Sequence, residues 1–115
     1  MLIVFGGLPG AGKTTIARLV AQGCGAAYLR IDAIEQALRA AEILPGDVGP
    51  AGYFVAYALS EANLKLGQAV VADCVNPLPV SRAAWRAVAA SASSPILEIE
   101  IHMLRQGRAP ATRRA

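Results

Sequence analysis

The residues with the clearest chemistry lie near the amino end of the chain, where glycines precede a lysine and two threonines. The segment reads Gly7-Leu8-Pro9-Gly10-Ala11-Gly12-Lys13-Thr14-Thr15 and directly follows the apolar run 2–5. Glycines at this spacing let successive backbone N–H groups surround an anion, while Lys13 can reach outer phosphates and Thr14 can offer its hydroxyl to Mg²⁺. A helix that begins at about Gly12 would add the positive end of its dipole. We therefore expect residues 7–15 to bind the phosphates of a nucleotide; the alternative is a plain glycine-rich turn between a strand and a helix.

An acidic residue at the end of a later apolar run is a candidate metal ligand. Asp73 follows Ala69-Val70-Val71-Ala72. Beside a phosphate-binding loop, a carboxylate in this position orients Mg²⁺ or its bound water. The expected metal ligands are therefore Thr14 and Asp73. The alternative is that Asp73 only caps the end of its strand.

Asp32 stands at the end of the apolar run 27–31. Ligands of open α/β sheets bind outside the carboxyl ends of the strands, so Asp32 is a candidate base that accepts the proton of an attacking hydroxyl group. With Glu35 three residues on, Asp32 also fits the pattern of a helix N-cap. The sequence leaves both interpretations open, and the expected catalytic residues are Lys13 and Asp32.

Three further residues are candidates for binding a second substrate, namely Arg30, Asn76 and Arg82. Arg30 lies within the predicted strand 27–31 and Asn76 follows the third predicted strand, while Arg82 lies near the start of the next predicted helix and shares a face of it with Arg86. Two arginines on one face can hold an anionic group. The alternative is that both are solvated.

The composition indicates one folded domain. The chain has 115 residues, of which 55% are hydrophobic and 17% charged, and its formal net charge is +3. Residues 1–101 carry a charge of −1 and residues 102–115 a charge of +4, so we expect a core at 1–101 and a basic, disordered tail at 102–115. Direct nucleic-acid binding is not expected. The apolar runs are too short to span a membrane and no basic segment precedes the first, which predicts a cytoplasmic protein.

Hydrophobic periodicity predicts parallel strands joined by helical crossovers, and so an α/β fold. We expect strands at 2–5, 27–31, 69–73 and 96–101, and helices at 12–24, 32–42, 52–66 and 81–91, the last with Ser81 as its N-cap. Glutamates alternate with apolar residues in 96–101, which is typical of a strand near the edge of a sheet. Such an edge could pair with a second copy of the chain, so dimerisation stays open.

Each predicted helix has an apolar stripe that we expect to face the core. The stripes are Ile16, Leu19 and Val20 in the first helix; Ile34, Ala37, Leu38 and Ala41 in the second; Val55, Ala58, Leu59, Ala62 and Leu66 in the third; and Trp85, Val88 and Ala89 in the fourth. The third helix also stacks Tyr53, Tyr57, Glu61 and Lys65 on another face. That face is either solvated or part of a substrate pocket.

These motifs resemble the small P-loop kinases, in particular the bacterial AAA-family ATP-binding type related to adenylylsulfate kinase, gluconate kinase and chloramphenicol phosphotransferase. The matching segments are residues 7–15, Arg30-Ile31-Asp32 with 34–38, and 70–77 followed by Arg82 and Trp85. The resemblance implies a three-layer P-loop fold with strand order 2-3-1-4. It also implies ATP and Mg²⁺ as cofactors and phosphoryl transfer from ATP to a small-molecule acceptor.

Kinases of this type continue past the fourth strand into an arginine-bearing lid helix, a fifth strand and a last helix. Residues 102–115 show no strand pattern and at most one short helical turn, so we expect the lid and last strand to be lacking, as in a truncated or frame-shifted gene. Two functions are therefore open: a small-molecule kinase, and a nucleotide-binding remnant without a functional lid.

Overall fold

The computed structural model describes residues 1–7, 12–42, 46, 49–75 and 79–101. Its elements are β1 (Leu2–Gly6), α1 (Lys13–Cys24), β2 (Ala27–Arg30), α2 (Ile31–Ala40), α3 (Ala51–Lys65), β3 (Val70–Asp73), α4 (Pro79–Ser91) and β4 (Ile96–Glu100). The tail at 102–115 lies outside the described residues, so the expected domain division stays a prediction. In the described part of the chain, no helix is long and apolar enough to cross a membrane.

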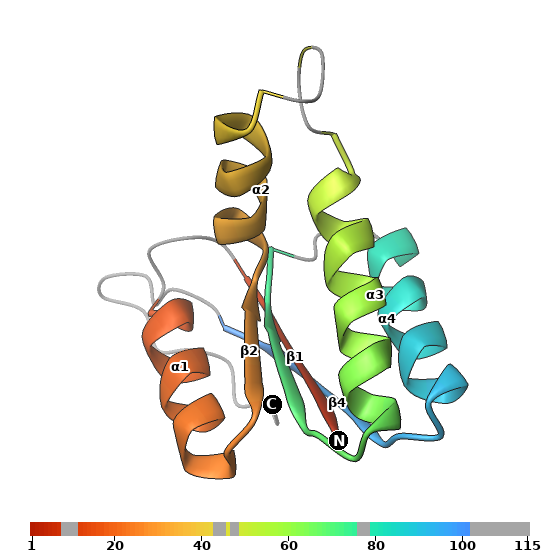
Figure 1. Ribbon diagram of the computed structural model, residues 1–115. Helices are drawn as coiled ribbons and strands as arrows, with labels where there is room; N and C mark the ends of the chain where they lie inside the picture. The colour runs from red at the N-terminus through yellow and green to blue at the C-terminus, as the bar shows by residue number, and fades with distance from the viewer. Residues whose placement is uncertain (8–11, 43–45, 47–48, 76–78, 102–115) are drawn as a thin grey trace.

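The four strands form one parallel sheet in the order β2-β3-β1-β4, which confirms the expected topology. The sheet lies between α1 on one face and α3 and α4 on the other, while α2 extends beyond the carboxyl end of β2 beside α3 (Figure 1). The central strands β1 and β3 are buried along their whole length. The edge strand β4 is only half-buried, with alternating glutamates, as its pattern predicted.

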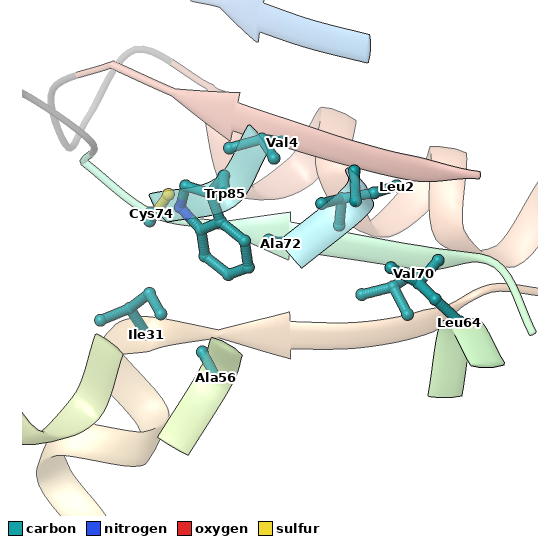
Figure 2. Packing of buried hydrophobic residues seen from close by; sticks show 10 residues of the cluster. Leu2, Val4, Ile31, Ala56, Leu64, Val70, Ala72, Cys74 and Trp85 are labelled. Carbon is teal, nitrogen blue, oxygen red and sulfur yellow. The ribbon is translucent and has the colours of Figure 1, made fainter. Parts of the chain in front are cut away.

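Successive side chains of a strand point to opposite faces, so the sheet has one apolar cluster on each side. The larger cluster, on the side of α3 and α4, contains Leu2, Val4, Ile31, Ala56, Leu64, Val70, Ala72, Cys74, Trp85 and Ala89. Figure 2 shows Trp85 lying against these strands with Cys74 beside it. The smaller cluster, on the side of α1, contains Ile3, Phe5, Ala17, Ala21 and Val71. The predicted inner stripe of α4 is confirmed by the burial of Trp85 and Ala89.

The predicted inner stripe of α1 is wrong at two of its three positions. Ile16 and Leu19 are exposed, whereas Lys13, Ala17 and Ala21 face the sheet. These three residues are four apart and share one side of the helix. The rotation of α1 therefore follows Lys13, whose side chain must turn inward to reach its partner on β3, and small alanines let the helix approach the sheet closely.

The predicted inner stripe of α3 is wrong as well. The buried residues are Gly52, Ala56, Ser60 and Leu64, while Val55, Leu59 and Leu66 are exposed. Tyr53 and Tyr57 pack against the larger cluster. The face of α3 that carries these tyrosines is therefore neither fully solvated nor an open pocket. Tyr57 lies edge-on to Trp85 with the ring centroids 4.8 Å apart.

Helix α3 turns its small residues inward because its neighbours approach closely. Gly52 lies against Glu35 of α2, and a Cβ at Gly52 would overlap the Glu35 side chain. In α2 the buried residue is Ile31, and Ile34 and Leu38 are half-buried. The predicted contributions of Ala37 and Ala41 to the core are wrong, because both are exposed.

Two predicted helix starts also differ from the structure. Ile31, expected as the last residue of a strand, is the first residue of α2. Helix α4 begins at Pro79, so Ser81 lies inside its first turn and is not the N-cap.

Candidate functional site

Glycines flank the predicted phosphate-binding segment on both sides. Gly7 follows β1 with φ 128° and donates its N–H to the carbonyl oxygen of Val75 at 3.2 Å. A Cβ at Gly7 would collide with the carbonyl group of Ile101, so the chain passes between the ends of β3 and β4 only because this residue has no side chain. Gly12 has φ 81° and is the N-cap of α1. Between these glycines, Leu8, Pro9, Gly10 and Ala11 lie outside the described residues, so their role in phosphate binding stays a prediction.

Lys13 and Asp73 meet at the carboxyl edge of the sheet. Lys13 is the first residue of α1 and Asp73 the last residue of β3, and the Lys13 ammonium group donates to Oδ1 of Asp73. The Lys13 side chain is 8% exposed and that of Asp73 1%. An isolated charge at this depth is strongly disfavoured, so each of the two groups depends on its partner. The structure thus brings together two of the predicted site residues.

Asp73 stays ionised because its hydrogen bonds outweigh its burial. Burial raises the pKa of the carboxyl group, but hydrogen bonds from Lys13, Tyr28 and Thr14 hold the pKa below its ordinary value. Thr14 is therefore also within reach of Asp73. A lysine, a threonine hydroxyl and a carboxylate converge at the amino end of α1, where the helix dipole favours an anion.

Tyr28 belongs to the same site, and sequence reasoning missed it. Its hydroxyl group donates to Oδ2 of Asp73 at 2.6 Å. Burial, followed by the hydrogen bond to Asp73, raises the pKa of Tyr28. In the parallel register Tyr28 pairs with Val71, so Asp73, two residues further on, points to the same face of the sheet. The pairing of the two strands could have been predicted from the sequence, but the hydrogen bond of the Tyr28 hydroxyl group could not.

The oxygen groups at this position fit magnesium. Mg²⁺ prefers oxygen ligands and is held by one or two protein groups together with water and substrate phosphates. Thr14 and Asp73 would supply a hydroxyl and a carboxylate oxygen. Among the described residues no cluster of three or more His, Cys, Asp or Glu side chains occurs, so no all-protein cage of that kind competes with this assignment.

Asp32 and Arg30 lie together at the end of β2, apart from any capping interaction. The N-cap of α2 is Arg30, without a side-chain hydrogen bond, and Asp32 lies in the first turn. The N-cap interpretation of Asp32 is therefore wrong. Its carboxylate is 54% exposed and lies 3.7 Å from the Arg30 guanidinium, which leaves it accessible to a ligand at this edge of the sheet.

The arginines of α4 differ in their partners. Arg86 forms two hydrogen bonds with Glu98 on β4, Nε to Oε1 at 2.9 Å and Nη2 to Oε2 at 2.8 Å. Arg82 is half-buried and has no ion pair among the described residues. Both line a pocket of about 480 Å³ with Val4, Gly6, Glu98, Ile99 and Glu100. Arg82 is thus available to an anion, whereas Arg86 already has a carboxylate partner.

The two cysteines take no part in the site, whereas the predicted substrate residue Asn76 is not described by the structure. Burial raises the pKa of Cys74 to about 12, so the thiol behaves as an apolar core group. Cys24 is exposed and both cysteines are free.

Comparison with known proteins identifies the fold. A model of the AAA domain family matches residues 2–107. No curated protein matches the chain. A predicted kinase from Chloroflexus aurantiacus is 21% identical with a TM-score of 0.76, covering 87% of this chain and 58% of that structure. The chain thus spans less than two thirds of that kinase.

Two further structures share the fold. The APS kinase of Mycobacterium tuberculosis is 24% identical with a TM-score of 0.61, covering 93% of this chain and 80% of that one. A gluconokinase from Sinorhizobium meliloti is 22% identical with a TM-score of 0.54, and the match covers 85% of this chain and 55% of that one. At such identities the likeness concerns the fold. The family match over residues 2–107, the strand order and the glycine segment before α1 agree, and the chain belongs to the AAA domain family with the fold of the small P-loop kinases.

Proposed function

We propose that this protein binds ATP with Mg²⁺ and transfers the terminal phosphoryl group to a hydroxyl group of a small molecule. The observation that carries the proposal is the buried contact between Lys13 and Asp73 at the amino end of α1. A lysine held there can exchange its carboxylate partner for a phosphate. Further support comes from the flanking Gly7 and Gly12, which both have positive φ angles that glycine adopts readily.

In the proposed step, the bond between the terminal phosphorus and its bridging oxygen breaks and a bond to the acceptor oxygen forms. ADP leaves with the bridging oxygen. Lys13 stabilises the negative charge on the phosphate oxygens. Thr14 and Asp73 would hold Mg²⁺, which supplies further charge neutralisation when bound.

Asp32 is the proposed base, and it would receive the proton of the acceptor hydroxyl group. Its support is its position at the carboxyl end of β2, its exposure, and the absence of a side-chain capping bond in α2. A carboxylate without a capping role can change protonation without unwinding its helix.

We assign Arg30, Asn76 and Arg82 to the acceptor. Arg82 is supported by its place in the pocket between α4 and β4, where a guanidinium group can hold an anionic part of the acceptor. Arg30 is supported by its place beside Asp32. Asn76 rests on the sequence pattern alone.

A second candidate is a protein that holds nucleotide without useful turnover. Two arginines near the carboxyl edge of the sheet, Arg30 and Arg86, already lie beside carboxylates. Within the part of the chain that the structure describes, Lys13 and Arg82 then remain to stabilise the transferring group. By analogy with arginine fingers, a missing positive charge costs roughly three to five orders of magnitude in rate.

Thermal denaturation with ATP, ADP, GTP and adenylylsulfate, with and without Mg²⁺, tests nucleotide binding. Both candidates predict a rise in Tm with nucleotide that Lys13→Ala largely abolishes. An ADP-release assay with a panel of hydroxyl-bearing acceptors separates them, because the kinase alone predicts acceptor-dependent release. Asp32→Asn should keep the nucleotide-induced rise in Tm and lose turnover; retained turnover excludes Asp32 as the base.

A further inference from the structure

The two carboxylate oxygens of Asp73 have different partners. Oδ1 accepts from Lys13 on α1, and Oδ2 accepts from the Tyr28 hydroxyl on β2 at 2.6 Å. Asp73 is almost fully buried. A buried carboxylate that lost these donors would be strongly destabilised, so the two contacts, with Thr14 also within reach of the carboxylate, hold its orientation.

The two donors also differ in how freely they can move. The Tyr28 ring packs against the apolar cluster on the α1 face of the sheet, which includes Val71 of the neighbouring strand. The Lys13 ammonium group stands on a flexible four-carbon chain. Lys13 can therefore turn from Asp73 toward a phosphate while its helix stays in place, whereas Tyr28 cannot leave without repacking the cluster.

We propose that Tyr28 is a positioning residue for Asp73. Its hydroxyl group keeps Oδ2 occupied, so that Oδ1 is the oxygen that Lys13 releases and that becomes available to Mg²⁺ or its bound water. This inference rests on the proposed function. It adds to the proposed site a group on β2, which is the edge strand opposite β4 and lies two places from β1, the strand that leads into the glycine segment.

A purely structural role for Tyr28 and a positioning role predict different effects of losing its hydroxyl group. In the structural role, loss of the hydroxyl group lowers the stability of the fold and leaves the effect of Mg²⁺ on nucleotide binding unchanged. In the positioning role, the carboxylate turns more freely once Lys13 has moved to the phosphates. Binding of the metal–nucleotide complex then weakens, while binding of the metal-free nucleotide does not.

The test is calorimetric titration of ATP into the full chain with Mg²⁺ and with EDTA. The proteins are the wild type, Tyr28→Phe and Tyr57→Phe. The control removes the same hydroxyl group from a tyrosine that packs against Trp85 on the opposite face of the sheet. Mg²⁺ raises the affinity for ATP by some factor in the wild type. We expect this factor to be about tenfold smaller in Tyr28→Phe, as for other groups that orient a metal ligand. Its affinity in EDTA and both affinities of Tyr57→Phe should match the wild type.

An unchanged Mg²⁺-dependent gain in Tyr28→Phe overturns the inference and leaves the proposed function intact. A wild type that binds no nucleotide overturns the proposed function itself. If Tyr28→Phe does not fold, a crystal structure of the wild type with Mg²⁺ and a non-hydrolysable ATP analogue decides instead. The inference is supported if the Tyr28 hydroxyl group donates to Oδ2 of Asp73 while Oδ1 of Asp73 faces the metal. It is contradicted if Tyr28 donates to Oδ1 and Oδ2 faces the metal.

Discussion

Lys13 and Asp73 are sixty positions apart in the chain, and the ammonium group of one contacts the carboxylate of the other in the interior. The contact joins the first turn of α1 to the last residue of β3. It therefore fixes the rotation of α1 and holds both groups at the amino end of that helix, where the proposed function requires them for a phosphate and Mg²⁺. The same pair should govern the stability of the nucleotide-free protein.

Replacing one partner of the Lys13–Asp73 pair should lower the free energy of unfolding more than replacing both partners. Lys13→Met leaves a buried carboxylate and Asp73→Asn leaves a buried ammonium group, and each should cost about 3 kcal/mol in free energy of unfolding. The double variant should cost less than either single variant, and therefore clearly less than their sum. Urea denaturation followed by the fluorescence of Trp85, the single tryptophan, measures this. Additive costs would show that the two side chains do not interact.

The contribution of Asp73 to stability should disappear in acid. Because the folded protein holds the pKa of Asp73 below its ordinary value, the stabilisation is complete above that ordinary value, near pH 4. It is lost as the pH falls through the lower, folded-state pKa. The difference in free energy of unfolding between wild type and Asp73→Asn should be constant from about pH 7 to 5. It should narrow below about pH 4; a difference that persists unchanged to pH 3 contradicts the assignment.

Gly7 should tolerate no side chain. Gly7→Ala adds a Cβ that collides with the carbonyl group of Ile101, at a φ of 128°. The matched control is Gly67→Ala, where φ is 84° but the space is open, so it bears only the backbone strain of about 1–2 kcal/mol. We expect Gly7→Ala to lose at least about 3 kcal/mol or not to fold. Equal losses in the two variants would mean that the ends of β1 and β4 are not so closely packed.

Two leucines of α3 test the orientation of that helix. Leu64 is 6% exposed and Leu59 44%. Leu64→Ala should cost about 3 kcal/mol and Leu59→Ala about 1 kcal/mol or less. Urea denaturation of both variants under identical conditions gives the comparison. A larger loss of stability in Leu59→Ala would mean that the helix face expected from the sequence pattern is buried, and would contradict the observed orientation of α3.

The sequence predicted the order of helices and strands because β1 and β3 are short apolar runs and the glycines mark the turn into α1. It also predicted Lys13, Thr14 and Asp73 as neighbours, since motifs of this kind place them at the same edge of the sheet. The pairing of Lys13 with Asp73 was not predicted, because a phosphate was the expected partner of the lysine.

The faces of α1 and α3 could not be predicted from hydrophobicity. Both helices turn small residues toward the sheet, Ala17 and Ala21 in one and Ala56 and Ser60 in the other. Close approach and the direction of Lys13 outweigh the burial of Ile16 or Leu59. Tyr28 was missed because a tyrosine in a strand usually indicates apolar packing rather than a contact with a carboxylate.

The central claim is that the amino end of α1 holds the phosphates of a nucleotide together with Mg²⁺. Calorimetric titration of ATP in the presence of Mg²⁺ into the folded wild type tests it most directly. We expect saturable heat with one site per chain, and an affinity at least about tenfold weaker in Lys13→Ala, in line with loss of a charge-assisted contact. No heat with any purine nucleotide, from protein whose Trp85 fluorescence reports the native fold, would contradict the account.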